Sequence, residues 1–103
     1  MISLQDETIH TLQSGSWLLF YYTDWCPLCP KLKELLEAME QTKPPFSIAQ
    51  IDFEQCPRSV QIYGVVGVPT VLALSNGALL EALPGMRPAE QYNALAARLA
   101  APA

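Results

Sequence analysis

The sequence predicts an α/β fold in three layers, with a central mixed sheet of about four to five strands and helices on both faces. Two observations carry this prediction. A buried strand at 17–22 is followed by a helical pattern and a second strand, a unit that joins parallel strands through a right-handed crossover. The dipeptide Asn76-Gly77 lies between two later apolar runs and indicates a hairpin, which adds an antiparallel edge.

The first half of the chain predicts helix, strand and helix. A short helix at 4–13 has a face formed by Leu4, Thr8, Ile9 and Leu12. His10 lies on its other face, as an ordinary surface residue. The apolar run 17–22 follows a Ser-Gly-Ser turn and is typical of a strand buried on both faces. A longer helix at 29–41 carries the apolar stripe Leu32, Leu35, Leu36 and Met39 and ends before two prolines.

The second half predicts strand, helix, two strands and a final helix. Loose alternation marks the first of these strands, and Pro57 suits the first turn of the helix after it. Pro84-Gly85 is expected to break the last strand. The predicted elements are strands at 46–53, 70–75 and 78–83, helices at 57–63 and 88–99, and a frayed tail at 100–103.

Composition limits the classes of function. The 103 residues predict one domain, 1–103, and half of them are hydrophobic. Lys and Arg number 6 against 10 Asp and Glu, with no basic cluster, so we expect no nucleic-acid partner. The apolar runs are too short to span a membrane, and the first residues lack the pattern of a signal peptide. We therefore expect a cytoplasmic protein without a membrane partner, unless a leader has been removed.

Two cysteines three positions apart, Cys26 and Cys29, lie where the strand at 17–22 gives way to the helix at 29–41. Free N–H groups and the positive end of the helix dipole favour a thiolate at this position. A lowered pKa makes Cys26 nucleophilic, and the second thiol, one turn along, can resolve a mixed disulfide. Three cysteines are too few for a disulfide scaffold, which favours a catalytic or metal-binding pair.

The motif Trp-Cys-x-x-Cys after the first long strand, with Val68-Pro69-Thr70 and Asn76-Gly77 further along, resembles the thioredoxin family. The resemblance extends from about Trp17 to Leu99. It implies the thioredoxin fold and a cis Val68–Pro69 peptide bond lying against the redox disulfide. It also implies a client-binding groove formed by Trp25, Pro27, Leu28, Val68, Pro69 and Gly85.

The family's mechanism, carried over by this resemblance, needs no cofactor beyond the Cys26–Cys29 disulfide and no metal. Cys26, exposed at the helix start, attacks a client disulfide, and the more buried Cys29 then frees the reduced client. The implied partners are disulfide-containing client proteins and a reductase, such as thioredoxin reductase or a glutathione system. The resemblance implies a monomer that serves cell redox homeostasis.

The sequence departs from the family beneath the cysteine pair. The family's buried Asp, six residues before the first cysteine, is Phe20 here, and its Lys partner aligns with Gln50. Replacing a buried charge pair by apolar residues is often neutral or stabilising. Alternatively, proton transfer to and from Cys29 is changed and exchange is slow. Both interpretations stay open.

Three carboxylates are candidates to replace the missing Asp as proton acceptor for Cys29. Asp24, Asp52 and Glu54 follow strand ends that converge at one edge of the sheet. Spacing alone does not choose among them, and an ordinary solvated carboxylate is the alternative for each.

Proline is unusually frequent around the pair. Pro27-Leu28 separates the cysteines where thioredoxins carry Gly-Pro, and proline after the first cysteine is a feature of glutaredoxins and disulfide oxidants. Pro30 replaces a basic residue of the family. These changes shift thiolate stability and so the redox potential. The family's first edge strand is expected to be reduced to residues 1–4 or missing.

The third cysteine, Cys56, has two interpretations. It is either a small half-buried residue at a helix start or a regulatory thiol whose pKa the helix N-terminus lowers. A thiol–disulfide oxidoreductase is the preferred function for the whole chain. The alternatives are a binding or assembly module with an idle cysteine pair, a more oxidising glutaredoxin-like role, and a zinc site. The zinc site would use Cys26, Cys29, Cys56 and His10, whose spacing is not that of a zinc ribbon.

Overall fold

A single mixed sheet of five strands, in the order β1-β3-β2-β4-β5, organises the computed structural model, which describes residues 1–101. Strand β3 pairs in parallel with both β1 and β2, whereas β4 is antiparallel to β2 and β5. The strands are β1 Ile2–Ser3, β2 Ser16–Tyr22, β3 Ser47–Asp52, β4 Thr70–Ser75 and β5 Ala78–Pro84. The predicted mixed sheet is confirmed.

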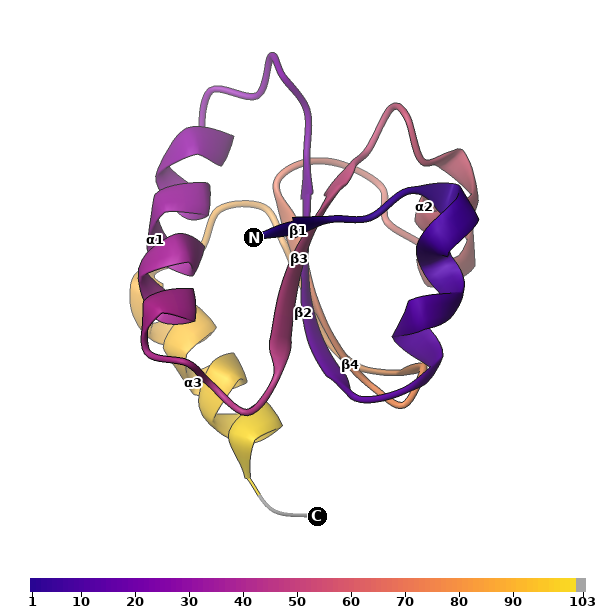
Figure 1. Ribbon diagram of the computed structural model, residues 1–103. Helices are drawn as coiled ribbons and strands as arrows, with labels where there is room; N and C mark the ends of the chain where they lie inside the picture. Colours follow the sequence, from indigo (N-terminus) through magenta and orange to yellow (C-terminus); the bar gives the residue numbers. More distant parts are fainter. Residues whose placement is uncertain (102–103) are drawn as a thin grey trace.

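Helices cover both faces of the sheet (Figure 1). Helices α1 and α3 lie on one face, and the helices η1 and α2 lie on the other. Their bounds are η1 Asp6–Gln13, α1 Cys29–Gln41, α2 Pro57–Tyr63 and α3 Ala89–Ala100. The three-layer α/β/α arrangement expected from the sequence is therefore present. None of these helices is long and apolar enough to cross a membrane.

Strand β2 separates two hydrophobic cores. Its alternating side chains divide between them: Leu18 and Phe20 pack in the core that α1 and α3 cover, and Leu19 and Tyr21 pack in the core on the η1 and α2 side. These four side chains are fully buried. Burying an apolar side chain of this size contributes about 1.5–3 kcal/mol. A strand that is apolar at consecutive positions therefore belongs in the middle of a sheet, where it carries the cysteine loop at its carboxyl end.

The N-terminal segment differs in detail from the prediction. The helix is a 3-10 helix that begins at Asp6, so Leu4 precedes it, and Thr8 is exposed instead of facing the core. The Thr8 hydroxyl accepts a hydrogen bond from the Gln5 N–H and donates one to the Gln5 carbonyl, which accounts for its outward position. The short edge strand β1 is present and pairs with β3.

Two element ends also differ. Strand β5 includes Pro84, which pairs with Thr70, because an edge strand tolerates a residue without an N–H donor. Helix α3 begins at Ala89, after Pro88, and includes Ala100, which the sequence placed in the tail. The rest of that predicted tail, residues 102–103, lies outside the described residues.

Candidate active site

The cysteine pair lies at the junction of β2 and α1. Cys29 is the first residue of α1, and Cys26 lies in the loop before it. Their Sγ atoms form a disulfide, with the two Cα atoms 5.4 Å apart. Two backbone hydrogen bonds hold the loop: Cys26 N–H donates to the Thr23 carbonyl at 3.3 Å, and Cys29 N–H donates to the Cys26 carbonyl at 3.4 Å. The loop therefore holds both sulfur atoms at the N-terminal end of α1.

The two cysteines are almost equally buried. Their relative exposures are 5% for Cys26 and 4% for Cys29, so the prediction that Cys26 is exposed and clearly less buried than Cys29 is wrong for this disulfide form. Each sulfur covers the other in the disulfide, and both residues belong to the core beneath α1. Exposure near the pair comes instead from Trp25, Pro27 and Leu28.

The loop before β4 contains a cis peptide bond between Val68 and Pro69, as the family resemblance implied. The Pro69 carbonyl accepts a hydrogen bond from the Gly85 N–H at 2.8 Å. Gly85 has a φ of +78°, a conformation that favours glycine. This bond links the proline loop to the segment after β5, so two of the segments expected to form the groove are joined directly.

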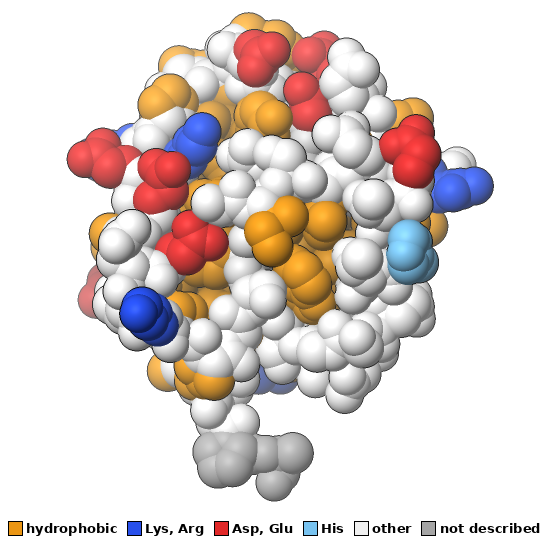
Figure 2. Space-filling view, viewed as in Figure 1, with side chains coloured by type: hydrophobic (Ala, Val, Ile, Leu, Met, Phe, Trp, Pro, Cys, Tyr) orange, Lys and Arg blue, Asp and Glu red, His pale blue; other side chains and the backbone are white. Residues whose placement is uncertain are grey.

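Large apolar side chains are exposed around these loops. Trp25 is 67% exposed, and Leu28 beside the pair is also exposed. Val66, in the loop that leads to Pro69, is the most exposed of the large apolar residues. Sequence reasoning did not select Val66, although its place between two glycines of a loop was a signal. Acidic side chains lie at the end of the viewed face where Figure 1 places the loop between β2 and α1 (Figure 2).

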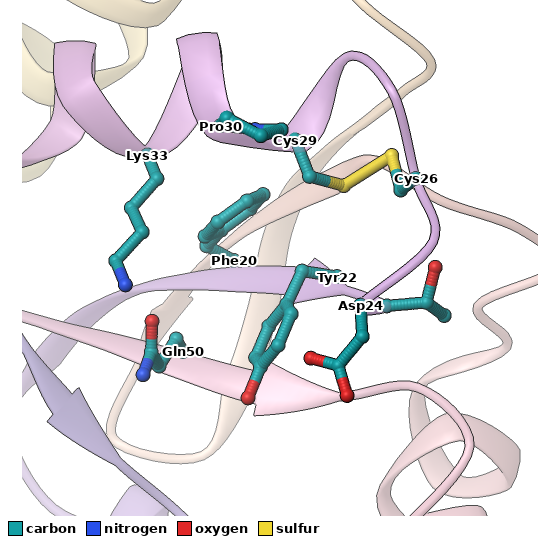
Figure 3. A pocket seen from close by; sticks show the side chains of 9 residues that line it. Phe20, Tyr22, Asp24, Cys26, Cys29, Pro30, Lys33 and Gln50 are labelled. Atoms are coloured by element: carbon teal, nitrogen blue, oxygen red, sulfur yellow. A yellow bond between two sulfur atoms is a disulfide. The ribbon is translucent and has the colours of Figure 1, made fainter.

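A cavity of about 370 Å³ lies beneath the disulfide (Figure 3). Its walls come from β2 and the loop after it, from α1 and from β3. The lining residues are Phe20, Tyr22, Thr23, Asp24, Cys26, Cys29, Pro30, Lys33 and Gln50. Two buried polar atoms here, Thr23 Oγ1 and Gln50 Oε1, have no hydrogen-bond partner among residues 1–101.

Comparison with known proteins decides the family. The Thioredoxin family model matches residues 4–98. The chain belongs to the thioredoxin family. It is 29% identical over 83 residues to the thioredoxin of Chlamydia muridarum, covering 81% of each chain, and 29% identical over 82 residues to that of Bacillus subtilis, covering 79% of each.

A solved structure agrees with this assignment. A mutant thioredoxin from Halobacterium salinarum NRC-1 superimposes with a TM-score of 0.84 at 23% identity, over 99% of this chain and 92% of the other. The thioredoxin fold predicted from the sequence is thus confirmed. Family membership and a cysteine pair that forms a disulfide together support thiol–disulfide oxidoreductase chemistry, with disulfide-containing clients and a reductase as the general class of partner.

The two residues that replace the thioredoxin family's buried Asp and Lys both line the cavity. The Phe20 ring is buried and its centroid lies 5.8 Å from that of Tyr22. The Gln50 amide Nε2 donates a hydrogen bond to Ser3 Oγ at 2.7 Å. Burial, with smaller contributions from the nearby Asp52 and Asp24 carboxylates, raises the pKa of Tyr22. No charged group therefore lies where the family places its ion pair.

The three candidate carboxylates have different surroundings. Asp52 Oδ1 accepts the backbone N–H groups of Glu54 and Gln55 at 2.9 and 3.2 Å. The Glu54 carboxylate accepts the indole N–H of Trp25 at 3.2 Å. Only Asp24 of the three lines the cavity that Cys29 also lines.

Lys33 is a cavity residue that sequence reasoning treated as a surface charge. It lies four positions after Cys29 on α1, and this spacing places both on one face of a helix. In Figure 3 its side chain extends toward Gln50. The spacing was therefore a usable signal, hidden because the residue does not belong to the apolar stripe.

Cys56 is fully buried rather than half-buried, with a relative exposure of 0%. Its Sγ donates a hydrogen bond to the Leu4 carbonyl at 3.7 Å. Burial, with smaller contributions from the Asp6 and Asp52 carboxylates, raises the pKa of this thiol, so the lowered pKa expected for a regulatory thiol is wrong. Within residues 1–101 no group of three or more His, Cys, Asp or Glu side chains could hold a metal ion, so the structure does not gather the ligands of the zinc alternative.

Proposed function

We propose that this protein reduces disulfide bonds in client proteins, with Cys26 as the attacking thiolate and Cys29 as the resolving one. The carrying observation is the Cys26–Cys29 disulfide at the N-terminal end of α1, in a chain that also has the cis Val68–Pro69 bond of the family. The helix dipole and free N–H groups at that end favour a thiolate over a thiol. Trp25, Pro27, Leu28, Val68, Pro69 and Gly85 are proposed to line the client groove.

The proposed reaction consists of two exchanges. The Cys26 thiolate attacks one sulfur of the client disulfide, which forms a mixed disulfide and releases one client thiolate. The Cys29 thiolate then attacks Cys26 Sγ, which closes the Cys26–Cys29 disulfide and releases the second client thiolate. Both client thiolates take protons from water. A separate reductase, either a thioredoxin reductase or a glutathione system, returns two electrons to the pair.

The proposal extends to the setting of the reaction. The internal disulfide is the redox group, and no further cofactor or metal takes part. The protein acts as a monomer in the cytoplasm, as the composition and family resemblance led us to expect.

A disulfide-reductase assay on a model disulfide protein tests this function. We expect the wild-type protein to reduce the disulfide catalytically with a thiol reductant. Cys26→Ser abolishes turnover, and Cys29→Ser arrests the reaction at the mixed disulfide, which is trapped as a covalent complex. Turnover that survives Cys26→Ser would contradict the assignment of roles.

Equilibration with glutathione buffers separates this function from a more oxidising, glutaredoxin-like one. The Cys26–Cys29 disulfide is quantified by thiol trapping, in a Cys56→Ser background so that only the pair reports. A potential near that of thioredoxin, about −270 mV, supports client reduction, whereas one near −180 mV indicates disulfide formation or exchange.

A second candidate is a binding module with an idle cysteine pair. The observation that favours it is the uncharged Phe20–Gln50 combination beneath Cys29, where the family has an ion pair. Negligible turnover by a folded protein that still binds clients would support this module.

A further inference from the structure

Resolution of the mixed disulfide requires Cys29 to lose a proton, and this inference, which rests on the proposed function, concerns where that proton goes. Cys29 is buried in the core beneath α1. An unpaired thiolate is unfavourable in such a place, so a nearby group must accept the proton as the attack begins. The Phe20 ring, in the family's Asp position, cannot accept it.

The cavity beneath the disulfide offers a route. Cys29 lines it together with charged or titratable groups from two of its walls: Tyr22 and Asp24 from β2 and its following loop, and Lys33 from α1. Gln50, which is uncharged, represents β3. Asp24 is the one carboxylate among these residues, and its side chain is exposed to solvent on its other side.

Thr23 adds an independent observation. It is only 3% exposed, and its Oγ1 is buried without a hydrogen-bond partner among residues 1–101. Gln50 Oε1, in the same cavity, is in the same position. A buried polar atom without a partner is costly unless water satisfies it, and the cavity volume far exceeds the roughly 30 Å³ that a water molecule occupies.

We propose that Asp24 accepts the proton of Cys29 through water that Thr23 binds in this cavity, and so replaces the carboxylate that Phe20 removed. The Cys29 S–H bond breaks and its proton passes through water to the Asp24 carboxylate. The Cys29 thiolate attacks Cys26 Sγ, the bond from Cys26 to the client sulfur breaks, and the client leaves as a thiolate. Asp24 then releases its proton to solvent.

The neighbouring charges are compatible with this route. Burial, with Asp52 and Asp24 adding to it, raises the pKa of Tyr22, so its phenol stays neutral near pH 7 and does not compete as a base. Lys33 extends toward Gln50 rather than toward the disulfide (Figure 3), and its ammonium has no proton-accepting capacity near pH 7. Asp52 is engaged with backbone N–H groups.

Rapid mixing of the reduced protein with dithiobis(nitrobenzoate), a coloured aromatic disulfide, separates the two steps. The first equivalent of nitrothiobenzoate is released when Cys26 attacks, and the second when Cys29 displaces the aromatic thiol from Cys26. A Cys56→Ser background removes the third thiol. The first phase therefore serves as an internal control for Cys26, and the second reports Cys29 alone.

We expect Asp24→Asn to slow the second phase about tenfold at pH 7, less than the roughly 100-fold that a directly bonded base supplies, because cavity water can still accept the proton. The rise of the second-phase rate with pH should move to higher pH, Asp24→Glu should restore it, and Thr23→Val should slow it by a smaller factor. Removing a negative charge by itself favours both thiolates and the anionic reagent, so a charge effect would accelerate both phases. Glu37→Gln, on the exposed side of α1, is the matched control and should leave both phases unchanged.

Two outcomes overturn different claims. If Asp24→Asn and the wild type have the same second-phase rate across the pH range, Asp24 is not the acceptor, while the proposed function stands. If the wild type releases only one equivalent and forms no Cys26–Cys29 disulfide, Cys29 does not resolve the intermediate, and the proposed function fails together with this inference.

Discussion

The indole N–H of Trp25 donates a hydrogen bond to the Glu54 carboxylate, 3.2 Å away and 29 positions later in the chain. Trp25 is otherwise largely exposed next to Cys26. The bond restricts the rotation of a large apolar ring that little else covers. A side chain held in this way loses less entropy when a client packs against it.

Glu54→Ala is therefore expected to weaken client reduction through binding. The exposed hydrogen bond contributes about 0.5–1 kcal/mol, which corresponds to a two- to fivefold rise in KM with kcat nearly unchanged. Steady-state kinetics on a model disulfide protein measure both constants. Glu37→Ala serves as the control for loss of one acidic charge, and an equal KM in the two variants would show that the bond to Trp25 does not matter.

Tyr21 predicts a pH dependence of stability. Its hydroxyl lies 2.6 Å from Ser59 Oγ in the core, and burial raises its pKa well above the ordinary value of 10.0, although the Ser59 hydrogen bond partly offsets the rise. In the unfolded chain this phenol ionises above about pH 10, whereas in the native protein it stays neutral. The stability it contributes is full below pH 10 and decreases as the pH rises further.

We expect urea unfolding to show this decrease between about pH 10 and 11.5, with a slope that is smaller in Tyr21→Phe. The variant should also lose about 1–2 kcal/mol at neutral pH, because Ser59 loses its partner in the core. Identical slopes for the two proteins would mean that Tyr21 ionises equally in the native and unfolded states.

Cys56 is predicted to be an inert thiol. It is the free cysteine of the described chain, it is fully buried, and burial raises its pKa. Reduced native protein should react with an aromatic disulfide at its cysteine pair, and the Cys56 thiol should react only after denaturant is added. Fast modification of Cys56 in the native protein, judged by mass spectrometry, would restore the regulatory interpretation.

Phe20→Asp would return the family's carboxylate to its usual position, and we expect it to destabilise this chain. The substitution removes a buried aromatic ring and places a carboxylate in an apolar core, at a cost of about 4 kcal/mol. Adding Gln50→Lys should recover at least about 1 kcal/mol by supplying a counter-charge. Urea denaturation measures both changes, and a fully tolerated single variant would show that the core is wetter than its packing indicates.

Features that depend on neighbouring residues were predictable from the sequence. Strand β2 announces its double burial by consecutive apolar residues, and Asn76-Gly77 specifies the β4–β5 hairpin. The cis bond before Pro69 followed from the family resemblance rather than from local preference, because trans is the default even before proline.

Features that depend on distant residues were not predictable in this way. Cys56 is fully buried, and its thiol bonds the Leu4 carbonyl, 52 positions earlier. The grouping of Asp24 with Lys33 and Gln50 exists only once α1 packs over β2 and β3. A residue's exposure and its partners are properties of the assembled layers, so pattern alone offered three carboxylates for Cys29, and the fold brings one of them into its cavity.

The Asp6 carboxylate accepts the backbone N–H groups of Arg58 and Ser59 at 3.1 and 3.0 Å, and so caps α2 from 52 positions away. Helix α2 has seven residues and no side-chain cap of its own, so it is too short to persist alone. Its folding is therefore conditional on the N-terminal segment being docked. We expect the amide hydrogens of α2 and η1 to exchange with solvent in one cooperative opening, while those of β2 open only with the whole molecule. Since α2 leads directly into the loop that holds Pro69, the N-terminal segment steadies one wall of the proposed groove without touching a client.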